Sequence, residues 1–437
     1  MTSWSRSADG AEGPAPEDSG EAHGAAVSES AAGAGAVRHT GAVSGSVAVM
    51  RDRAARVIPV MGRAFVGYCV LGLALYQALN SYLTEVFRGG YTYRTSEWLI
   101  SYAGGFVRRG LFGELLFGLA PAGRPTIVAL AAIQFSCYAV VLAYLLSYLQ
   151  RARYSWSALT LALGPAALPF IGWDVGGGFR KEILVFVAVI LLAWARGAAR
   201  RAVRVSLQAL AVLVFGLAMF SWEASVVGVP IMLYLLRDDD GRPALRLPRG
   251  WASLAIVSLA VAGAAASVLS RGTPETSGAI CNQVIEHGLT PELCHQAIEA
   301  LSWSTDYVLQ EQAARFPLYW SYFVLLPLTV LPVVVSPWLR RHWQWFAATV
   351  LAVVPLYLIG QDYGRWAHLL VMLPALAIMA GAPADAEWPR WRAGWAFAYL
   401  TLWGLPHWLR ADDAWPWLGF FVAILDLLGF QTGGSYY

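Results

Sequence analysis

The segment TIVALAAIQFSCYAVVLAYLLSYL, residues 126–149, contains no charged side chain over its 24 positions. A helix of this length extends about 36 Å, because an α-helix rises about 1.5 Å per residue, and the hydrocarbon core of a bilayer is about 30 Å thick. A helix also pairs all of its backbone N–H and C=O groups within one segment, which lipid requires. The segment therefore predicts a transmembrane α-helix.

Apolar segments of similar character recur along the chain. They lie at residues 60–83, 156–173, 182–197, 205–222, 224–237, 251–270, 317–338, 344–361, 366–382 and 393–410. A shorter segment at 416–430 is either a further span or a re-entrant hairpin. Charged residues make up 14% of the chain and its mean hydropathy is +0.52, whereas soluble domains are about 25% charged. The sequence predicts an all-α polytopic membrane protein with about 11–12 transmembrane helices.

Every second connection between the apolar segments is rich in arginine. These arginines are Arg51, Arg53, Arg56, Arg63, Arg151, Arg153, Arg196, Arg200, Arg201, Arg204, Arg237, Arg242, Arg246, Arg249, Arg340, Arg341, Arg390 and Arg392. Because Lys and Arg concentrate in cytoplasmic loops, we expect a multi-pass protein of the cell inner (plasma) membrane with a cytoplasmic N-terminus. The remaining connections, of which 84–125 and 271–316 are long, are then extracytoplasmic.

The chain divides by composition into a tail and a membrane domain. Residues 1–50 are rich in Ala, Gly, Ser and acidic residues and predict a disordered cytoplasmic tail, whereas residues 51–437 form the polytopic transmembrane domain. In the first external connection, the short mixed runs 97–100 and 111–117 predict interfacial helices. Residues 271–316 predict an external cap, in which we expect Cys281 and Cys294 to form a disulfide.

Three basic clusters lie on the expected extracytoplasmic side, where Lys and Arg are normally scarce. They are GGFVRRG at residues 104–110, GGGFRKE at 176–182 and DYGRW at 362–366. Guanidinium groups match phosphate oxygens, and flanking glycines allow close approach of the backbone to an anion. We therefore predict a phosphate-binding set of Arg108, Arg109, Arg180, Lys181 and Arg365. In the alternative interpretation these side chains anchor the protein at the membrane interface or pair with nearby carboxylates.

Two carboxylates stand out as candidate catalytic groups. Glu223 lies in a tight turn between two apolar segments, and Asp174 follows an apolar segment and precedes the glycine run. A carboxylate beside a hydroxyl group acts as a general base. Beside Arg365, we expect Asp362, Tyr363 and Trp366 to contact substrate. The alternative is that each carboxylate neutralises an arginine, which applies most to Asp362 with Arg365 and to Glu182 with Arg180 or Lys181.

Several motifs of other enzyme classes are missing from the sequence. It contains no P-loop, no HExxH, no dinucleotide fingerprint and no paired-cysteine zinc motif. His287, His295, His368 and His407 lack metal-ligand spacing and are typical of surface or interface histidines. No cofactor is required, although a pair of carboxylates is able to hold Mg²⁺ or Mn²⁺. No nucleic-acid partner is predicted.

The layout resembles the GT-C class of polyprenyl-phosphate-dependent integral membrane glycosyltransferases. The shared features are a cytoplasmic N-terminus, many spans, a long first external loop with interfacial helices and acids, and a further acid, here Asp174, in the next external loop. The resemblance is architectural and covers the first span to about the seventh. In that class an acid of the first loop acts as base toward the acceptor hydroxyl, which here corresponds to Glu85 or Glu97. Members commonly carry an Asp or paired acids there, and this chain departs from that pattern.

The resemblance implies a function. It implies transfer of a sugar from a polyprenyl-phosphate or pyrophosphate lipid to an acceptor at the extracytoplasmic face, in cell-envelope glycan assembly, with the lipid bilayer as the surrounding partner. Two alternatives stay open. One is a polymerase or ligase of lipid-pyrophosphate-linked polysaccharide, and the other is a lipid-linked glycan flippase or transporter, which breaks such as Gly164-Pro165 would suit.

Overall fold

The computed structural model describes residues 41–87, 93–237, 250–381, 391–408 and 419–429. Within these residues the regular elements are α-helices and 3-10 helices, without a β-strand, which confirms the predicted all-α fold class. Residues 1–40 of the expected disordered tail lie outside the described residues, and helix α1 (Gly41–Phe87) begins within the last part of that tail. The chain divides into Met1–Ala55 and Arg56–Tyr437, and the following description concerns the second unit.

Five helices in the described part of the chain are long and apolar enough to cross a bilayer. They are Ile58–Phe87 of α1, α4 (Arg124–Arg151), α8 (Arg201–Ser221), α10 (Trp251–Leu269) and α15 (Tyr363–Gly381). The number becomes six if α12 (Thr305–Arg315) and Tyr319–Val334, which meet at a bend of 75°, form one broken span. These helices identify a multi-pass membrane protein.

The other expected spans occur as shorter or interrupted helices. They correspond to α5 (Trp156–Leu163) with α6 (Phe170–Trp173), α7 (Glu182–Gly197), the 3-10 helix η2 (Glu223–Gly228) with α9 (Val229–Leu235), α13 (Tyr322–Val334), α14 (Pro337–Ile359), α16 (Ala393–Thr401) and α17 (Gly419–Leu427). Proline explains part of this difference, because it removes a backbone donor and clashes with the preceding turn. Pro165 and Pro169 lie between α5 and α6. A second kind of break occurs in α14, where the backbone of His342 is not helical. Hydropathy alone does not detect such breaks.

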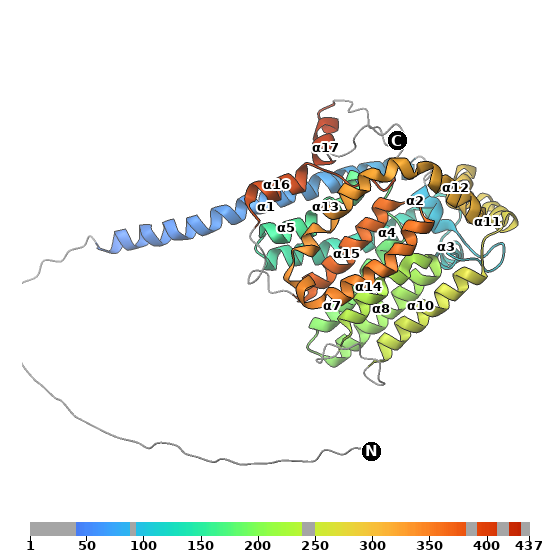
Figure 1. The fold of residues 1–437 in the computed structure, drawn as a ribbon, viewed down its shortest axis with the longest axis horizontal. Helices are drawn as coiled ribbons and strands as arrows, with labels where there is room; N and C mark the ends of the chain where they lie inside the picture. Colours follow the sequence, from blue (N-terminus) through green and yellow to red (C-terminus); the bar gives the residue numbers. More distant parts are fainter. Residues whose placement is uncertain (1–40, 88–92, 238–249, 382–390, 409–418, 430–437) are drawn as a thin grey trace, which may run out of the picture. The chain divides into compact units, whose positions relative to one another are not determined.

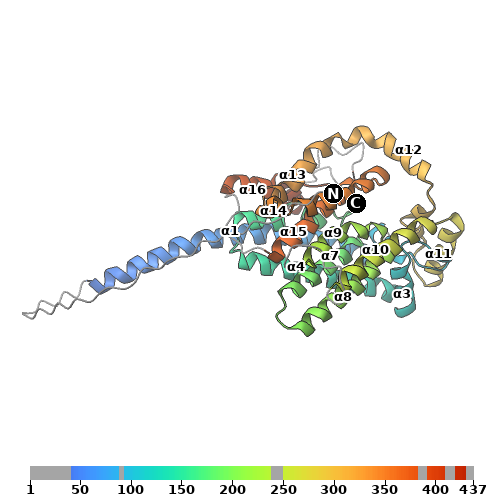
Figure 2. The same ribbon diagram turned by 60° about the horizontal axis from the view of Figure 1, so that its bottom comes forward.

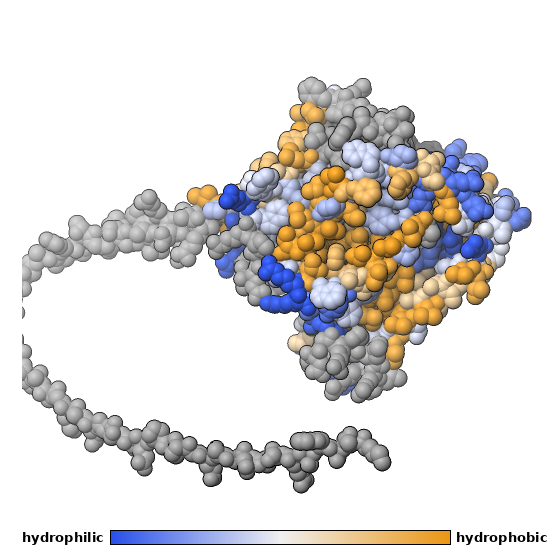
Figure 3. Space-filling view, in the orientation of Figure 1, coloured by the Kyte–Doolittle hydropathy of each residue, from blue (hydrophilic) through white to orange (hydrophobic). Residues whose placement is uncertain are grey.

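Helices α7 and α15 form the interior of the second unit. In α15, 89% of the apolar window is buried inside the protein, against 22–33% in the other four candidate spans. Helix α7 packs against α4, α8 and α15, and α15 also contacts α13 and α14 (Figure 1). A helix that is apolar on every side is enclosed by neighbouring helices, whereas exposed residues such as Phe65 and Leu213 suit contact with lipid. Figure 3 shows an apolar area that crosses one face between hydrophilic regions.

The connection after α1 contains α2 (Tyr93–Ser96), the 3-10 helix η1 (Glu97–Leu99) and α3 (Leu111–Leu119). Helix α3 buries Phe112 on one side and exposes the apolar side chains of Leu115 and Leu119 on the other. The run 97–100, predicted to lie at the lipid interface, is instead buried within the protein, and Trp98 is fully inaccessible. The Trp98 indole N–H donates a 2.9 Å hydrogen bond to the Phe179 carbonyl, so η1 belongs to the protein interior.

A cap of α11 (Pro274–Glu286), η3 (Pro291–His295), η4 (Glu299–Ser302) and α12 covers this connection. Cys281 and Cys294 form a disulfide that joins α11 to η3. The Ser96 hydroxyl donates to the Leu293 carbonyl at 2.7 Å, and the Ser101 hydroxyl donates to Gln283. In both orientations of the ribbon α3 and α11 lie at the same end of the helices (Figures 1 and 2). The cap therefore holds the segment that carries Glu97.

Loss of this disulfide is expected to loosen the cap. Closure of a loop of this size by a disulfide contributes about 2–4 kcal/mol, so the double substitution of Cys281 and Cys294 by Ser should lower the thermal midpoint of the purified protein by several degrees. The half-buried free cysteine Cys69, replaced by Ser, is the matched control. Equal thermal midpoints for the double variant and the control would show that the bond does not stabilise the cap.

Candidate functional site

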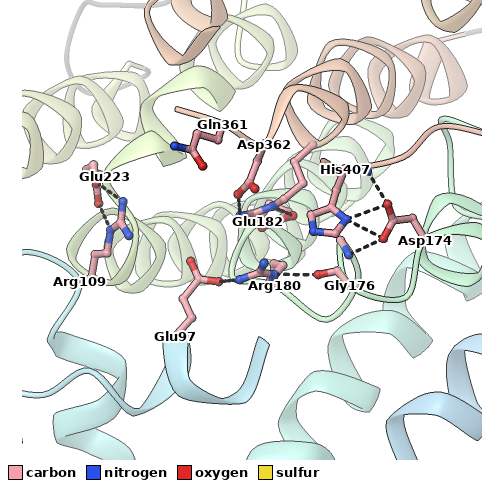
Figure 4. Close-up of polar contacts among 12 residues, drawn as sticks. Glu97, Arg109, Asp174, Gly176, Arg180, Glu182, Glu223, Gln361, Asp362 and His407 are labelled. Carbon is pink, nitrogen blue, oxygen red and sulfur yellow. Dashed lines mark hydrogen bonds and ion pairs between the residues drawn. The ribbon is translucent and has the colours of Figure 1, made fainter. Parts of the chain in front are cut away.

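Most of the charged side chains that the sequence singles out come together beside the first turns of α7 and α15 (Figure 4). The charged cluster, as we call this group below, consists of Glu97, Arg108, Arg109, Asp174, Arg180, Lys181, Glu182, Glu223, Asp362, Arg365 and His407. Removal of an ion from water costs several kcal/mol, so a buried charge needs a partner. The partner of each side chain decides what else it is able to bind.

Arg365 joins the starts of the two interior helices. Its Nε and Nη2 donate to the two oxygens of Glu182 at 3.1 and 2.7 Å, and its Nη1 donates to Asp362 Oδ2 at 2.6 Å. Both Arg365 and Glu182 are about 3% exposed. The carboxylate in the first turn of α7 also suits the positive end of the helix dipole. Arg365 is thus fully occupied by two carboxylates. The alternative pairing of Asp362 with Arg365 is observed, whereas Glu182 pairs with Arg365 instead of Arg180 or Lys181.

Arg180 forms a second buried pair. Its Nη1 lies 3.2 Å from Glu97 Oε2, its Nε donates to the Gly176 carbonyl at 3.2 Å, and its guanidinium carbon lies 4.4 Å from the centre of the Tyr93 ring. Burial raises the pKa of Glu97, but the charges of Arg365 and Arg180 outweigh burial and the net pKa is lowered. Glu97 is therefore ionised and neutralises Arg180.

The turn that carries Arg180 is held in a strained backbone conformation. Phe179 has a φ of 57°, in the left-handed region that side chains other than glycine rarely adopt. Its carbonyl accepts hydrogen bonds from Trp98 and from the Gln134 amide at 2.7 Å, and its N–H donates to the Tyr138 hydroxyl at 3.0 Å. These bonds fix the direction in which the side chains of Arg180 and Lys181 leave the turn.

Arg108 and Arg109 share one carboxylate. Arg109 donates to both oxygens of Glu223, from Nε at 2.7 Å and from Nη2 at 2.5 Å, whereas Arg108 Nη1 lies 3.6 Å from Glu223 Oε1. Burial raises the pKa of Glu223, but the arginines outweigh it and hold the pKa at about 2.

Lys181 Nζ donates to the carbonyls of Arg109 at 3.1 Å and Ser221 at 2.9 Å. Burial lowers the pKa of Lys181 to about 7.

Arg108 and Arg109 form the accessible edge of the charged cluster, and positive charge exceeds negative charge there. The side chains of Arg108 and Arg109 are 29% and 21% exposed, and Glu223 is the carboxylate that they contact. Burial lowers the pKa of the Arg108 guanidinium, and repulsion from Arg109 and Arg271 lowers it further. Arg108 Nε is buried without a hydrogen-bond partner in the described part of the chain. An anion with several oxygens would compensate both the charge and the unpaired donor.

Asp174 has a different kind of partner. Its carboxylate accepts from the Gly177 N–H at 3.0 Å and from the His407 backbone N–H, and both oxygens lie 2.7 Å from His407 Nδ1. Burial raises the pKa of Asp174, but the His407 charge and these hydrogen bonds outweigh it and lower the pKa. A Cβ on Gly176 would lie 2.8 Å from the imidazole, so the glycine run makes room for His407.

The predicted catalytic carboxylates thus fall into two groups. Glu85 pairs with Arg94, Glu97 with Arg180, and Glu223 with Arg109. Asp174 has no arginine partner among the described residues. The interpretation of the arginines as partners of carboxylates therefore describes Arg109, Arg180 and Arg365. Glu223, a candidate catalytic group by its position in a tight turn, is neutralised by Arg109. Hydrophobicity and spacing did not identify these pairs, because the partners belong to different helices.

The residues expected to contact substrate around Arg365 take separate positions. Asp362 belongs to the charged cluster, and the Trp366 ring stacks with Trp222 at 6.4 Å between ring centres. Tyr363 stacks on Tyr319 at 4.3 Å and donates to the Tyr357 carbonyl, in a neighbouring aromatic group. Among the described residues, no group of three or more His, Cys, Asp or Glu side chains is arranged to hold a metal ion.

His407 is the member of the cluster that sequence reasoning missed. It lies 233 residues from Asp174 in the chain, in the segment that follows α16, and no spacing pattern connects the two. Its neighbours in sequence, Pro406 and Trp408, are typical of many span ends.

Comparison of the chain with known protein families, with curated proteins and with solved structures found no match.

Proposed function

We propose that the protein is a membrane glycosyltransferase, which moves a sugar from a polyprenyl-phosphate donor to a hydroxyl acceptor at the extracytoplasmic face. The observation that carries the proposal is the charged cluster itself. It combines an accessible edge with surplus positive charge, at Arg108 and Arg109, with one ionised carboxylate, Asp174, that no arginine of the described residues neutralises. A lipid phosphate needs the first feature and a hydroxyl nucleophile needs the second.

The cost of burying charge supports a functional role. Buried ion pairs are often no more stable than apolar packing of the same volume, so the fold does not require so many ions beside α7 and α15. In membrane proteins, buried ionisable groups often mark substrate sites. Arg180 and Arg365, which are saturated by Glu97 and Glu182, support the geometry of the cluster. This division refines the predicted phosphate-binding set to its accessible members.

The chemistry assigns a role to each part of the cluster. The acceptor oxygen forms a bond to the anomeric carbon of the donor sugar, and the bond between that carbon and the phosphate oxygen breaks. The phosphate leaves with the bonding electron pair, and its developing charge is stabilised by Arg108 and Arg109. The hydroxyl proton leaves toward the pair formed by Asp174 and His407. Arg guanidinium groups suit this task because they stay charged where water is sparse.

The test is an assay of purified protein in lipid nanodiscs. It uses a polyprenyl-phosphate sugar with a panel of hydroxyl acceptors, and product is detected by mass spectrometry. Transfer of the sugar is the expected result. Transfer only from a pyrophosphate-linked oligosaccharide would indicate a polymerase or ligase, and movement of a labelled lipid across the bilayer without a new bond would indicate a flippase. Either outcome would overturn the proposal.

Replacement of Arg108 by Ala should weaken the use of the donor. A hydrogen bond to a charged group contributes about 1.5–3 kcal/mol, so kcat/KM for the donor should fall about ten- to hundredfold. The effect should decrease at high salt, because Arg108 is partly exposed and exposed charges are screened. Arg151→Ala, at an exposed arginine of α4, is the matched control and should leave the rate unchanged. A rate for Arg108→Ala equal to that of the control would exclude Arg108 from the donor site.

A further inference from the structure

His407 is held from several directions. Asp174 accepts from its backbone N–H and contacts its Nδ1 atom at 2.7 Å, and the His407 carbonyl accepts from the Gly364 N–H at 3.2 Å. The Tyr322 hydroxyl donates to the preceding carbonyl, of Pro406, at 2.7 Å. A Cβ on Gly364 would overlap the Pro406 carbonyl, so glycine is required for this close approach. The ring position is therefore fixed by the turn after α6, by α13 and by the start of α15.

Two carboxylates face the imidazole. Asp174 contacts it from the turn after α6, and Asp362 lies close enough before α15 for the His407 charge to lower the pKa of Asp362. The Arg365 and Arg180 charges contribute more to that lowering, and both are already neutralised by Glu182 and Glu97. Tyr322, from α13, is a neutral neighbour that donates to a carbonyl. Figure 4 shows the His407 ring between Asp362 and Asp174.

The second nitrogen of the ring is available for chemistry. Nδ1 faces Asp174, and Nε2 makes no hydrogen bond to any described residue. The side chain is 21% exposed, whereas that of Asp174 is 4% exposed. The imidazole is therefore more accessible to a hydroxyl group from outside than the carboxylate is. A carboxylate that receives Nδ1–H fixes the tautomer in which Nε2 carries the lone pair.

We infer that His407 Nε2 accepts the proton of the sugar acceptor's hydroxyl, and that Asp174 is the positioning residue that orients the imidazole and fixes its tautomer. This assignment rests on the proposed glycosyl transfer. The O–H bond of the acceptor breaks as its oxygen bonds the anomeric carbon, the proton moves to Nε2, and the donor's phosphate leaves with the electron pair of the broken bond. The imidazolium then releases its proton to water. Such proton transfer typically accelerates a reaction about 10²–10⁴-fold.

A purely structural role of His407 makes a different prediction, and two amide variants separate the roles. In His407→Asn the amide nitrogen occupies the position of Nδ1, so it keeps the bond to Asp174 but lacks a basic atom. In His407→Gln the amide occupies the position of Nε2 and the bond to Asp174 is lost. A structural clamp would leave His407→Asn active and His407→Gln impaired. If His407 accepts the proton, both variants should be impaired.

The experiment measures transfer from the polyprenyl-phosphate sugar by the full-length protein between pH 5 and 9, together with the thermal midpoint. We expect His407→Asn to keep its midpoint, to lose at least a hundredfold in kcat with little change in KM, and to lose the acid limb of the pH profile. His295→Asn is the matched control, because His295 also lies beside a carboxylate, Glu299, but is 77% exposed.

The possible outcomes are distinct. If the wild-type protein transfers the sugar and His407→Asn retains at least half of the rate with the same pH profile, His407 is only a clamp and the inference is wrong, while the proposed function stands. If both amide variants lose transfer and both keep their thermal midpoints, the inference holds. If the wild-type protein transfers no sugar to any acceptor, the proposed function fails, and the assigned role of His407 fails with it.

Discussion

Replacement of Arg365 by Ala is expected to destabilise the folded protein by about 3–5 kcal/mol, because the carboxylates of Glu182 and Asp362 then lose their shared cation. Glu182 is 3% exposed and lies at the start of an interior helix, so it has no access to water that would replace the guanidinium. A protein of marginal stability would unfold or fail to accumulate. The measurement is thermal unfolding of the purified variant in detergent, combined with its yield from membranes.

The control for this prediction removes both charges. The double variant Arg365→Met with Glu182→Leu eliminates the buried ions and keeps the volume apolar, so it should be more stable than Arg365→Ala. Asp362 is 28% exposed and tolerates the loss of its partner better than Glu182 does. If Arg365→Ala instead keeps its thermal midpoint and loses only donor binding, Arg365 belongs to the phosphate site and is not required for the fold.

Replacement of Asp174 by Asn should lower the rate of sugar transfer by about 10²–10⁴-fold while the protein stays folded. The amide keeps the shape of the carboxylate, but it removes the negative charge that fixes the orientation and the tautomer of His407. Because Asp174 has no arginine partner among the described residues, its neutralisation leaves no buried cation unpaired. We expect the loss in kcat, with a small effect on KM.

The matched control is Glu299→Gln. Glu299 is also a carboxylate beside a histidine, His295, at 3.6 Å, but it is 53% exposed on the cap, so its substitution should leave transfer unchanged. A rate for Asp174→Asn within twofold of the control would remove Asp174 from the mechanism. A collapse of the thermal midpoint in this variant would show instead that the contact with His407 chiefly stabilises the fold. Measurement of the rate and the midpoint on the same preparation separates these results.

Part of the candidate site follows from the sequence, because it depends on the position of charged residues relative to apolar segments. Arg108, Arg109 and Arg180 were singled out by their places at segment ends, and all three occur in one cluster. Asp174 was singled out by its position before a glycine run. The partners of these residues did not follow from the sequence. In the alternative interpretation Glu182 pairs within its own segment, but its partner Arg365 lies 183 residues away.

The sequence by itself determined that this is an all-α membrane protein, because hydropathy and backbone hydrogen bonding are properties of each segment taken alone. Only the tertiary structure decided which apolar segments are interior helices, since α7 and α15 are apolar like the other segments and become interior through their neighbours. It also decided that Arg109, Arg180 and Arg365 are bound to carboxylates and that Asp174 is bound to His407. The physical reason is that ion pairs and hydrogen bonds act over a few ångströms in space, and packing of helices sets those distances between residues far apart in the chain.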